Sequence, residues 1–180
     1  IVGFRYRKVQ PNAHFASDNV RAGERAIGLY NALAGYTAER SGKGEFDSPR
    51  LELRRFLADD DGLIDTAETY LAVRIPPAFD IDGLISFVTG TAGDADVVCD
   101  QRLEGVVTSK NTPLIRAFLK GIRAAGGRPT FTKKTGTSDM CVVGPAWGCP
   151  IVAYGPGDSR LDHRPDEHLP LDEYTRAIDV

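Results

Sequence analysis

Residues that could bind an anion gather in the segment 134–173. Gly136, Thr137 and Ser138 precede an apolar run that predicts a helix, and a helix leaves its first amide groups unpaired. Such a helix start attracts carboxylates or phosphates, so the sequence predicts a substrate anchor at this point. A helix cap that binds no ligand is the alternative interpretation.

A histidine in the same segment could ligate a metal. His163 follows Asp162 and precedes Arg164 and Pro165. Because proline opposes a regular helix, we expect His163 in an exposed loop. The loop follows a predicted strand over 150–154, and ligands bind at the carboxyl ends of strands in α/β sheets. A neutral imidazole there could bind a metal, although a solvated surface histidine fits the same pattern.

Hydrophobic periodicity predicts the elements that must position these residues. In the first half we expect a strand over 1–10, a helix over 19–39, strands over 51–57 and 67–75, a helix over 80–88 and a strand over 95–100. The 19–39 helix carries Val20, Ile27, Leu29, Tyr30 and Leu33 roughly at helical spacing. The order β-α-β-β-α-β predicts a ferredoxin-like α+β domain, an antiparallel sheet with helices on one face.

The second half predicts part of an α/β domain. Pro113 suits the first turn of a helix over 111–125, and Gly126 and Gly127 suit its end. The pattern then predicts a strand over 128–134, a helix from Thr137, a strand over 150–154 and a helix over 169–178. The strands that would complete their sheet are absent from the chain.

The motifs TSDM, YGPGD and LDHRPDEH, followed by an acidic helix, occur in an order that resembles a known family. This family is that of the di-zinc aminoacylases, acetylornithine deacetylases and carboxypeptidase G. Within it, KTGTSDM and YGPGDSRLDHRPDEH most resemble the lysine-biosynthesis deacetylases that release lysine or ornithine from an amino-group carrier protein. Acetylornithine deacetylase and metallo-carboxypeptidase activities are the alternatives. Cys141 stands where that subfamily commonly has a polar residue such as asparagine.

The resemblance implies a hydrolase with two zinc ions per complete subunit, or cobalt in their place. His163 would be a zinc ligand, and the residues 136–138 would contact the substrate carboxylate. Asp139 would orient a neighbouring group or interact with the helix dipole. Glu167 and His168 would hold the loop, since His163 and His168 are spaced poorly for two ligands from one helix.

In the family, the ferredoxin-like domain is a lid and dimerisation module inserted into the catalytic domain. We therefore expect a lid over 1–106, a catalytic segment over 107–180 and a homodimer formed through the lid. His14 matches the family's lid histidine, which reaches into the active site and helps to polarise the scissile carbonyl. In dimeric members this histidine reaches the active site of the partner subunit. Arg74 matches a substrate-binding arginine on a later lid strand. A core or capping histidine and a solvated strand charge are the alternatives.

The family's other metal ligands are missing from this sequence. They comprise an H-x-D motif, a bridging aspartate, a Glu-Glu pair and a further acid. We therefore expect the chain to be the C-terminal part of a longer enzyme whose general-base glutamate lies upstream. The alternative from another class is a non-catalytic ferredoxin-like binding module, but such a module leaves TSDM and LDHRPDEH unexplained.

Composition limits the class of partner and the compartment. The 180 residues are 42% hydrophobic and carry a formal net charge of −3, which argues against a nucleic-acid or anionic-membrane binder. No apolar run approaches bilayer length. Cys99, Cys141 and Cys149 lack paired spacing, so we expect reduced thiols in the cytoplasm. The expected partners are an N-acyl diamino acid and an acidic carrier protein.

Overall fold

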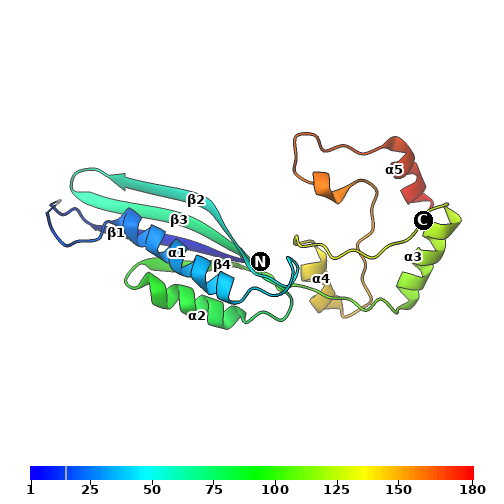
Figure 1. Ribbon diagram of the computed structural model, residues 1–180, viewed down its shortest axis with the longest axis horizontal. Coiled ribbons are helices and arrows are strands. Elements are labelled where there is room, and N and C mark those ends of the chain that lie inside the picture. The colour runs from blue at the N-terminus through cyan, green and yellow to red at the C-terminus, as the bar shows by residue number, and fades with distance from the viewer. Residues whose placement is uncertain (15) are drawn as a thin grey trace. The chain divides into compact units, whose positions relative to one another are not determined.

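The structure, a computed structural model, describes residues 1–14 and 16–180 and divides into two compact units (Figure 1). Unit 1 comprises Ile1–Gly105 and Lys134–Thr137, and unit 2 comprises Val106–Lys133 and Ser138–Val180. The predicted lid elements all belong to unit 1.

Unit 1 has the predicted β-α-β-β-α-β order. Its elements are β1 (Val2–Pro11), α1 (Ala22–Glu39), β2 (Arg50–Asp60), β3 (Ile64–Arg74), α2 (Ile81–Ala92) and β4 (Asp96–Arg102). The strands form one antiparallel sheet in the order β2-β3-β1-β4. The ferredoxin-like prediction is therefore confirmed, and α1 and α2 lie on the same face of the sheet (Figure 1).

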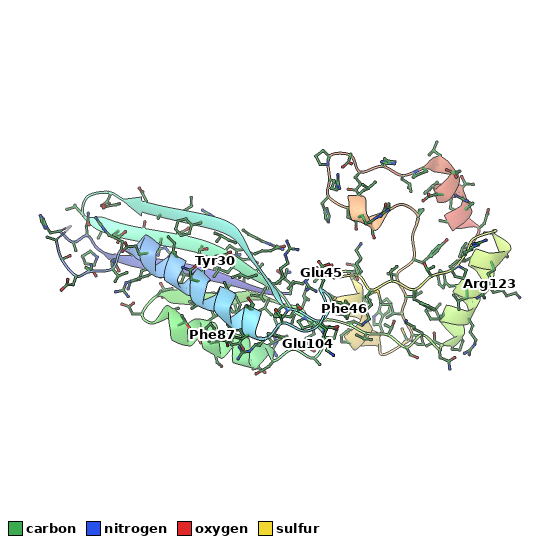
Figure 2. All side chains as sticks on the ribbon, in the orientation of Figure 1. Tyr30, Glu45, Phe46, Phe87, Glu104 and Arg123 are labelled. Carbon is green, nitrogen blue, oxygen red and sulfur yellow. The ribbon has the colours of Figure 1, made fainter. Side chains whose placement is uncertain are left out.

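The core of unit 1 lies between this face and the two helices. On β1, Phe4 and Tyr6 are buried while Arg5 between them is exposed, as strand alternation requires. Leu29 and Leu33 of α1 are also buried. The rings of Tyr36 on α1 and Phe87 on α2 lie 4.3 Å apart between their centroids. Figure 2 shows Phe87 on its helix.

The apolar residues at helical spacing in the first predicted helix are only partly buried. Val20 and Ile27 are 47% and 50% exposed, whereas Leu29 and Leu33 are buried and Tyr30 is partly buried against the core. Helix α1 begins at Ala22, so Val20 precedes it. Ile27 lies two positions from Leu29, about 200° around the helix, and therefore points away from the sheet.

We expect Asp65→Ala to destabilise unit 1 by about 1–3 kcal/mol. The buried Asp65 carboxylate accepts hydrogen bonds from the Ala22 backbone N–H (2.7 Å) and from Gln10 Nε2 (3.1 Å). The Ala22 amide is among the first of α1 and has no partner within the helix. Urea unfolding followed by circular dichroism measures the loss. Asp65→Asn, which keeps the shape and one acceptor, should lose less, and equal stability of all three proteins would contradict the expectation.

Unit 2 contains α3 (Pro113–Ala124), α4 (Met140–Trp147), the short 3-10 helix η1 (Ser159–Leu161) and α5 (Leu171–Ile178). The predicted helices over 111–125 and 169–178 are confirmed. The predicted strands over 128–134 and 150–154 are wrong, because both segments have irregular backbone. A strand forms only when a neighbouring strand accepts and donates its backbone hydrogen bonds, and no other segment among the described residues pairs with either one.

Candidate functional site

His14 lies in the segment between β1 and α1, and its side chain is exposed. Its Nδ1 accepts a hydrogen bond from the Ala16 backbone N–H at 3.2 Å. The Ser17 N–H donates to the His14 carbonyl at 2.8 Å. Because Nδ1 is an acceptor, the neutral imidazole carries its proton on Nε2. His14 therefore presents an N–H donor to solvent, as a group that polarises a carbonyl would need.

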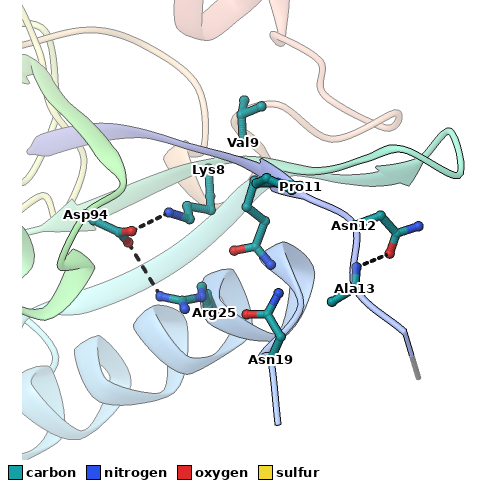
Figure 3. Close-up of a pocket in the computed structure, with 9 residues that line it drawn as sticks. Lys8, Val9, Pro11, Asn12, Ala13, Asn19, Arg25 and Asp94 are labelled. Carbon is teal, nitrogen blue, oxygen red and sulfur yellow. Dashed lines mark hydrogen bonds and ion pairs between the residues drawn. The ribbon is translucent and has the colours of Figure 1, made fainter. Parts of the chain in front are cut away.

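A pocket of about 570 Å³ opens beside this segment and was not predicted from the sequence (Figure 3). Lys8 is buried on β1, and its Nζ lies 2.7 Å from an oxygen of Asp94. Arg25 of α1 approaches the same carboxylate at 3.5 Å. The hydrogen bond from Lys8 and the positive charges of Lys8 and Arg25 lower the pKa of Asp94 below its usual value. The sequence feature that could have indicated this pocket is Lys8, a lysine at an inward-facing position of the alternating strand β1.

Arg74 anchors a loop in unit 1. Its Nη2 donates hydrogen bonds to the backbone carbonyls of Glu45 and Ser48, in the connection between α1 and β2. Its Nε is buried and has no hydrogen-bond partner among the described residues. The guanidinium therefore orders this connection, and its predicted role in substrate binding stays a prediction.

The predicted anion anchor precedes α4. Gly136, Thr137 and Ser138 are exposed, and α4 begins at Met140, later than the predicted start at Thr137. Hydroxyl residues and glycine favour caps over helix interiors, which explains the later start. Asp139 occupies the N-cap position, but its side chain makes no capping hydrogen bond. A carboxylate there interacts favourably with the helix dipole.

The loop that carries His163 is tied to its own neighbours. His163 is exposed and has φ of +64°. This is a left-handed backbone conformation, which residues other than glycine adopt at a cost in free energy. Its backbone N–H donates to Glu167 Oε2 at 2.9 Å, so Glu167 holds the loop. His168 Nδ1 lies 2.9 Å from the Asp166 carbonyl oxygen. Strained backbone of this kind clusters at functional sites, which favours a functional interpretation of His163.

The turn before this loop is stabilised by an ion pair. Arg160 Nη2 lies 2.6 Å from Asp158 Oδ2, and the Arg160 backbone N–H donates to Asp158 Oδ1. These hydrogen bonds lower the pKa of Asp158 to about 2. A carboxyl group with a lowered pKa in the folded state stabilises that state at pH values above its ordinary pKa. This stabilisation is lost as the pH falls toward 2. The turn therefore keeps its ion pair throughout the neutral range.

The residues predicted from the sequence fall into separate groups. His14, Arg74, Gly136 and Thr137 belong to unit 1, whereas Ser138, Asp139, His163 and Glu167 belong to unit 2. Among the described residues, His163 and Glu167 are the two of this set that share a hydrogen bond. Within residues 1–14 and 16–180, no group of three or more histidine, cysteine, aspartate and glutamate side chains could hold a metal ion.

The fit to zinc is limited to one donor. The exposed imidazole of His163 suits a single zinc ligand, while two zinc ions need several carboxylates and imidazoles.

The part of the chain that the structure describes has no helix with the length and apolar character needed to cross a lipid bilayer.

Comparison with known proteins identifies close relatives in sequence. The "[LysW]-lysine hydrolase" of Deinococcus radiodurans is 38% identical over 184 residues, which covers 98% of this chain and 51% of that protein. A "putative [LysW]-lysine/[LysW]-ornithine hydrolase" of Thermococcus kodakarensis is 59% identical over 71 residues, which covers 39% of this chain and 21% of that protein. The chain thus spans at most about half the length of these two relatives.

Solved structures share the fold. The M20 family metallo-carboxypeptidase Sso-CP2 from Sulfolobus solfataricus superposes with a TM-score of 0.73 at 14% identity, over 99% of this chain and 56% of that one. Residues 6–180 match the peptidase family M20/M25/M40. The β-α-β-β-α-β unit, the motifs around His163 and this match over nearly the whole sequence agree, and the chain belongs to the peptidase family M20/M25/M40.

Proposed function

We propose that this chain is part of a zinc-dependent amide hydrolase that releases lysine or ornithine from an amino-group carrier protein. The observation that carries the proposal is the 38% identity, along 98% of the chain, to a protein named [LysW]-lysine hydrolase. The motifs TSDM and LDHRPDEH support the same substrate class. The activity belongs to the whole protein, of which this chain supplies the equivalent of about half.

Four residues of this chain would take part in metal binding, substrate binding and catalysis. His163 would donate one imidazole to a metal whose other ligands lie outside the described residues. When bound, zinc polarises an amide carbonyl and lowers the pKa of a coordinated water. Thr137 and Ser138 would contact the carboxylate of the amino acid that is released. His14 would donate its Nε2 proton in a hydrogen bond to the amide oxygen, where negative charge develops during the reaction.

We also propose a homodimer formed through unit 1. Strand β2 is at the edge of the sheet, so its outer backbone groups have no strand partner within the described residues. Leu53, Phe56 and Leu57 on this strand are 46%, 38% and 50% exposed. An exposed edge with apolar side chains is suited to pairing with a second copy. The free thiols of Cys99, Cys141 and Cys149 favour a cytoplasmic location.

The substrate proposal is tested by comparing kcat/KM of the full-length enzyme for three amides. These are lysine or ornithine linked to the carrier protein, N-acetylornithine and a dipeptide. We expect the carrier-linked amide to be hydrolysed most efficiently. If a side-chain charge reversal on the acidic carrier lowers kcat/KM, the carrier itself contributes binding. A preference for N-acetylornithine or the dipeptide would instead favour a deacetylase or a carboxypeptidase.

Residues 1–180 alone should not hydrolyse amides. One imidazole binds zinc far too weakly to retain a catalytic ion, and the described residues form no metal-binding group. Turnover of N-acyl-lysine by this polypeptide, with zinc or cobalt added, is the measurement. Chelator-sensitive turnover comparable to that of the full-length enzyme would show that the other ligands do not lie outside the chain.

A further inference from the structure

Asn12 connects the strand β1 to the hairpin between β2 and β3. Its backbone N–H donates to the Leu63 carbonyl at 2.7 Å, and its Nδ2 donates to Asp60 Oδ1 at 2.7 Å. Its Oδ1 accepts from the Ala13 backbone N–H at 2.8 Å, an interaction visible in Figure 3. The backbone immediately before His14 is therefore held by three hydrogen bonds of one asparagine.

Arg21 closes the other end of the same segment. It is the residue before α1, and its backbone N–H donates to Glu24 Oε2 at 3.0 Å. Its Nη1 donates to Asp60 Oδ2 at 3.0 Å and to Asn12 Oδ1. A single guanidinium thus joins the end of the His14 segment, its beginning and the hairpin.

Asp60 is the point where these contacts meet. One of its oxygens accepts from Asn12 Nδ2 and from the Gly62 backbone N–H, each at 2.7 Å, and the other accepts from Arg21. The side chains of Arg21 and Asp60 are 38% and 37% exposed. A half-exposed ion pair of this kind contributes little to the stability of a fold. Its main effect is therefore on the local geometry of the segment.

We propose that Asn12, Arg21 and Asp60 form a positioning cluster for His14. The cluster ties Asn12 and Arg21, on either side of His14, to the β2–β3 hairpin, so that the His14 ring keeps Nδ1 as an acceptor and Nε2 as the outward donor. These three residues act through the imidazole. The proposal rests on the proposed role of His14 in amide hydrolysis.

The test compares Arg21→Met with the wild type in the full-length enzyme. The variant keeps the aliphatic stem and removes the donors to Asp60 and Asn12. We expect kcat to fall between about tenfold and a hundredfold, while KM, metal content and melting temperature stay near wild type. Arg21→Lys, which keeps a charged donor, should recover part of kcat. Arg7→Met is the matched control, because it breaks an exposed ion pair between β1 and Glu68 of β3 and should leave kcat unchanged.

A second comparison separates this proposal from the proposed role of His14. In a His14→Ala background, Arg21→Met should cause no further loss of kcat, because the imidazole that the cluster positions is already gone. Equal losses in both backgrounds, or a wild-type kcat for Arg21→Met, would overturn the positioning role.

A readout that needs no activity is ¹⁵N NMR of the His14 ring. The wild type should show an unprotonated Nδ1, and Arg21→Met should mix the two tautomers. If His14→Ala keeps wild-type turnover, the proposed role of His14 in amide hydrolysis is wrong. The ring spectra then test by themselves whether the cluster positions the imidazole. Identical ring spectra in both proteins would overturn it.

Discussion

Replacing His163 by alanine in the full-length enzyme will remove one of two bound metal ions per subunit and lower turnover by at least about a hundredfold. The fold will survive, because His163 is exposed on a loop and contributes no side chain to a core. Elemental analysis of the purified protein measures the metal content, and circular dichroism measures the fold. Two metal ions and a normal rate in the variant would show that His163 is not a ligand.

Two controls separate ligation from backbone effects. His163→Gly removes the imidazole but adopts a φ of +64° without strain, so it should lose metal as completely as the alanine variant. His168→Ala removes an equally exposed histidine of the same loop, whose Nδ1 lies near the Asp166 carbonyl oxygen. It should retain both metal ions. Loss of metal in His168→Ala alone would move the ligand assignment to that residue.

The His14→Ala variant should lose about a hundredfold to a thousandfold in kcat, with little change in KM. The physical reason is that a hydrogen bond from Nε2 strengthens as negative charge develops on the amide oxygen. Metal content should be unchanged, since the described residues around His14 form no metal-binding group. His14→Gln, whose amide keeps an N–H donor, should recover part of the rate. A variant with normal kcat and raised KM would instead assign His14 to substrate binding.

Mixed dimers determine whether His14 acts on its own subunit or on its partner. Subunits carrying His14→Ala are combined with subunits that lack the upstream general base. Partial recovery of turnover is expected if the imidazole of one subunit serves the active site of the other. Absence of recovery in dimers shown to be mixed would place the action of His14 within its own subunit.

Unit 1 was predictable because its signals are local. The hydrophobic periodicity of each strand and helix lies within a single element, and the order of these elements left the ferredoxin-like arrangement as the prediction. The errors occurred where an element depends on what lies beside it. Ile27 has the residue type of a core position but points away from the sheet, which hydrophobicity alone did not distinguish.

The segments 128–134 and 150–154 show the same dependence more strongly. Both were predicted to be strands, and neither forms one in this structure. A strand is defined by hydrogen bonds to a neighbour, so its residues alone cannot establish it. The sequence nevertheless contained the family assignment, because the motifs around Ser138 and His163 specify residue types at fixed spacing and need no partner strand.

The sequence by itself determined the family, the order of elements in unit 1 and the identity of His14 and His163 as candidate site residues. Only the tertiary structure decided which side chains hold the segment on either side of His14. Asn12 and Asp60 are 48 positions apart in the sequence. The pairing of β1 and β2 with β3 brings Asn12 Nδ2 to 2.7 Å from Asp60 Oδ1. Such a contact depends on strand register, which is a property of the whole sheet and leaves no periodic signal in either segment.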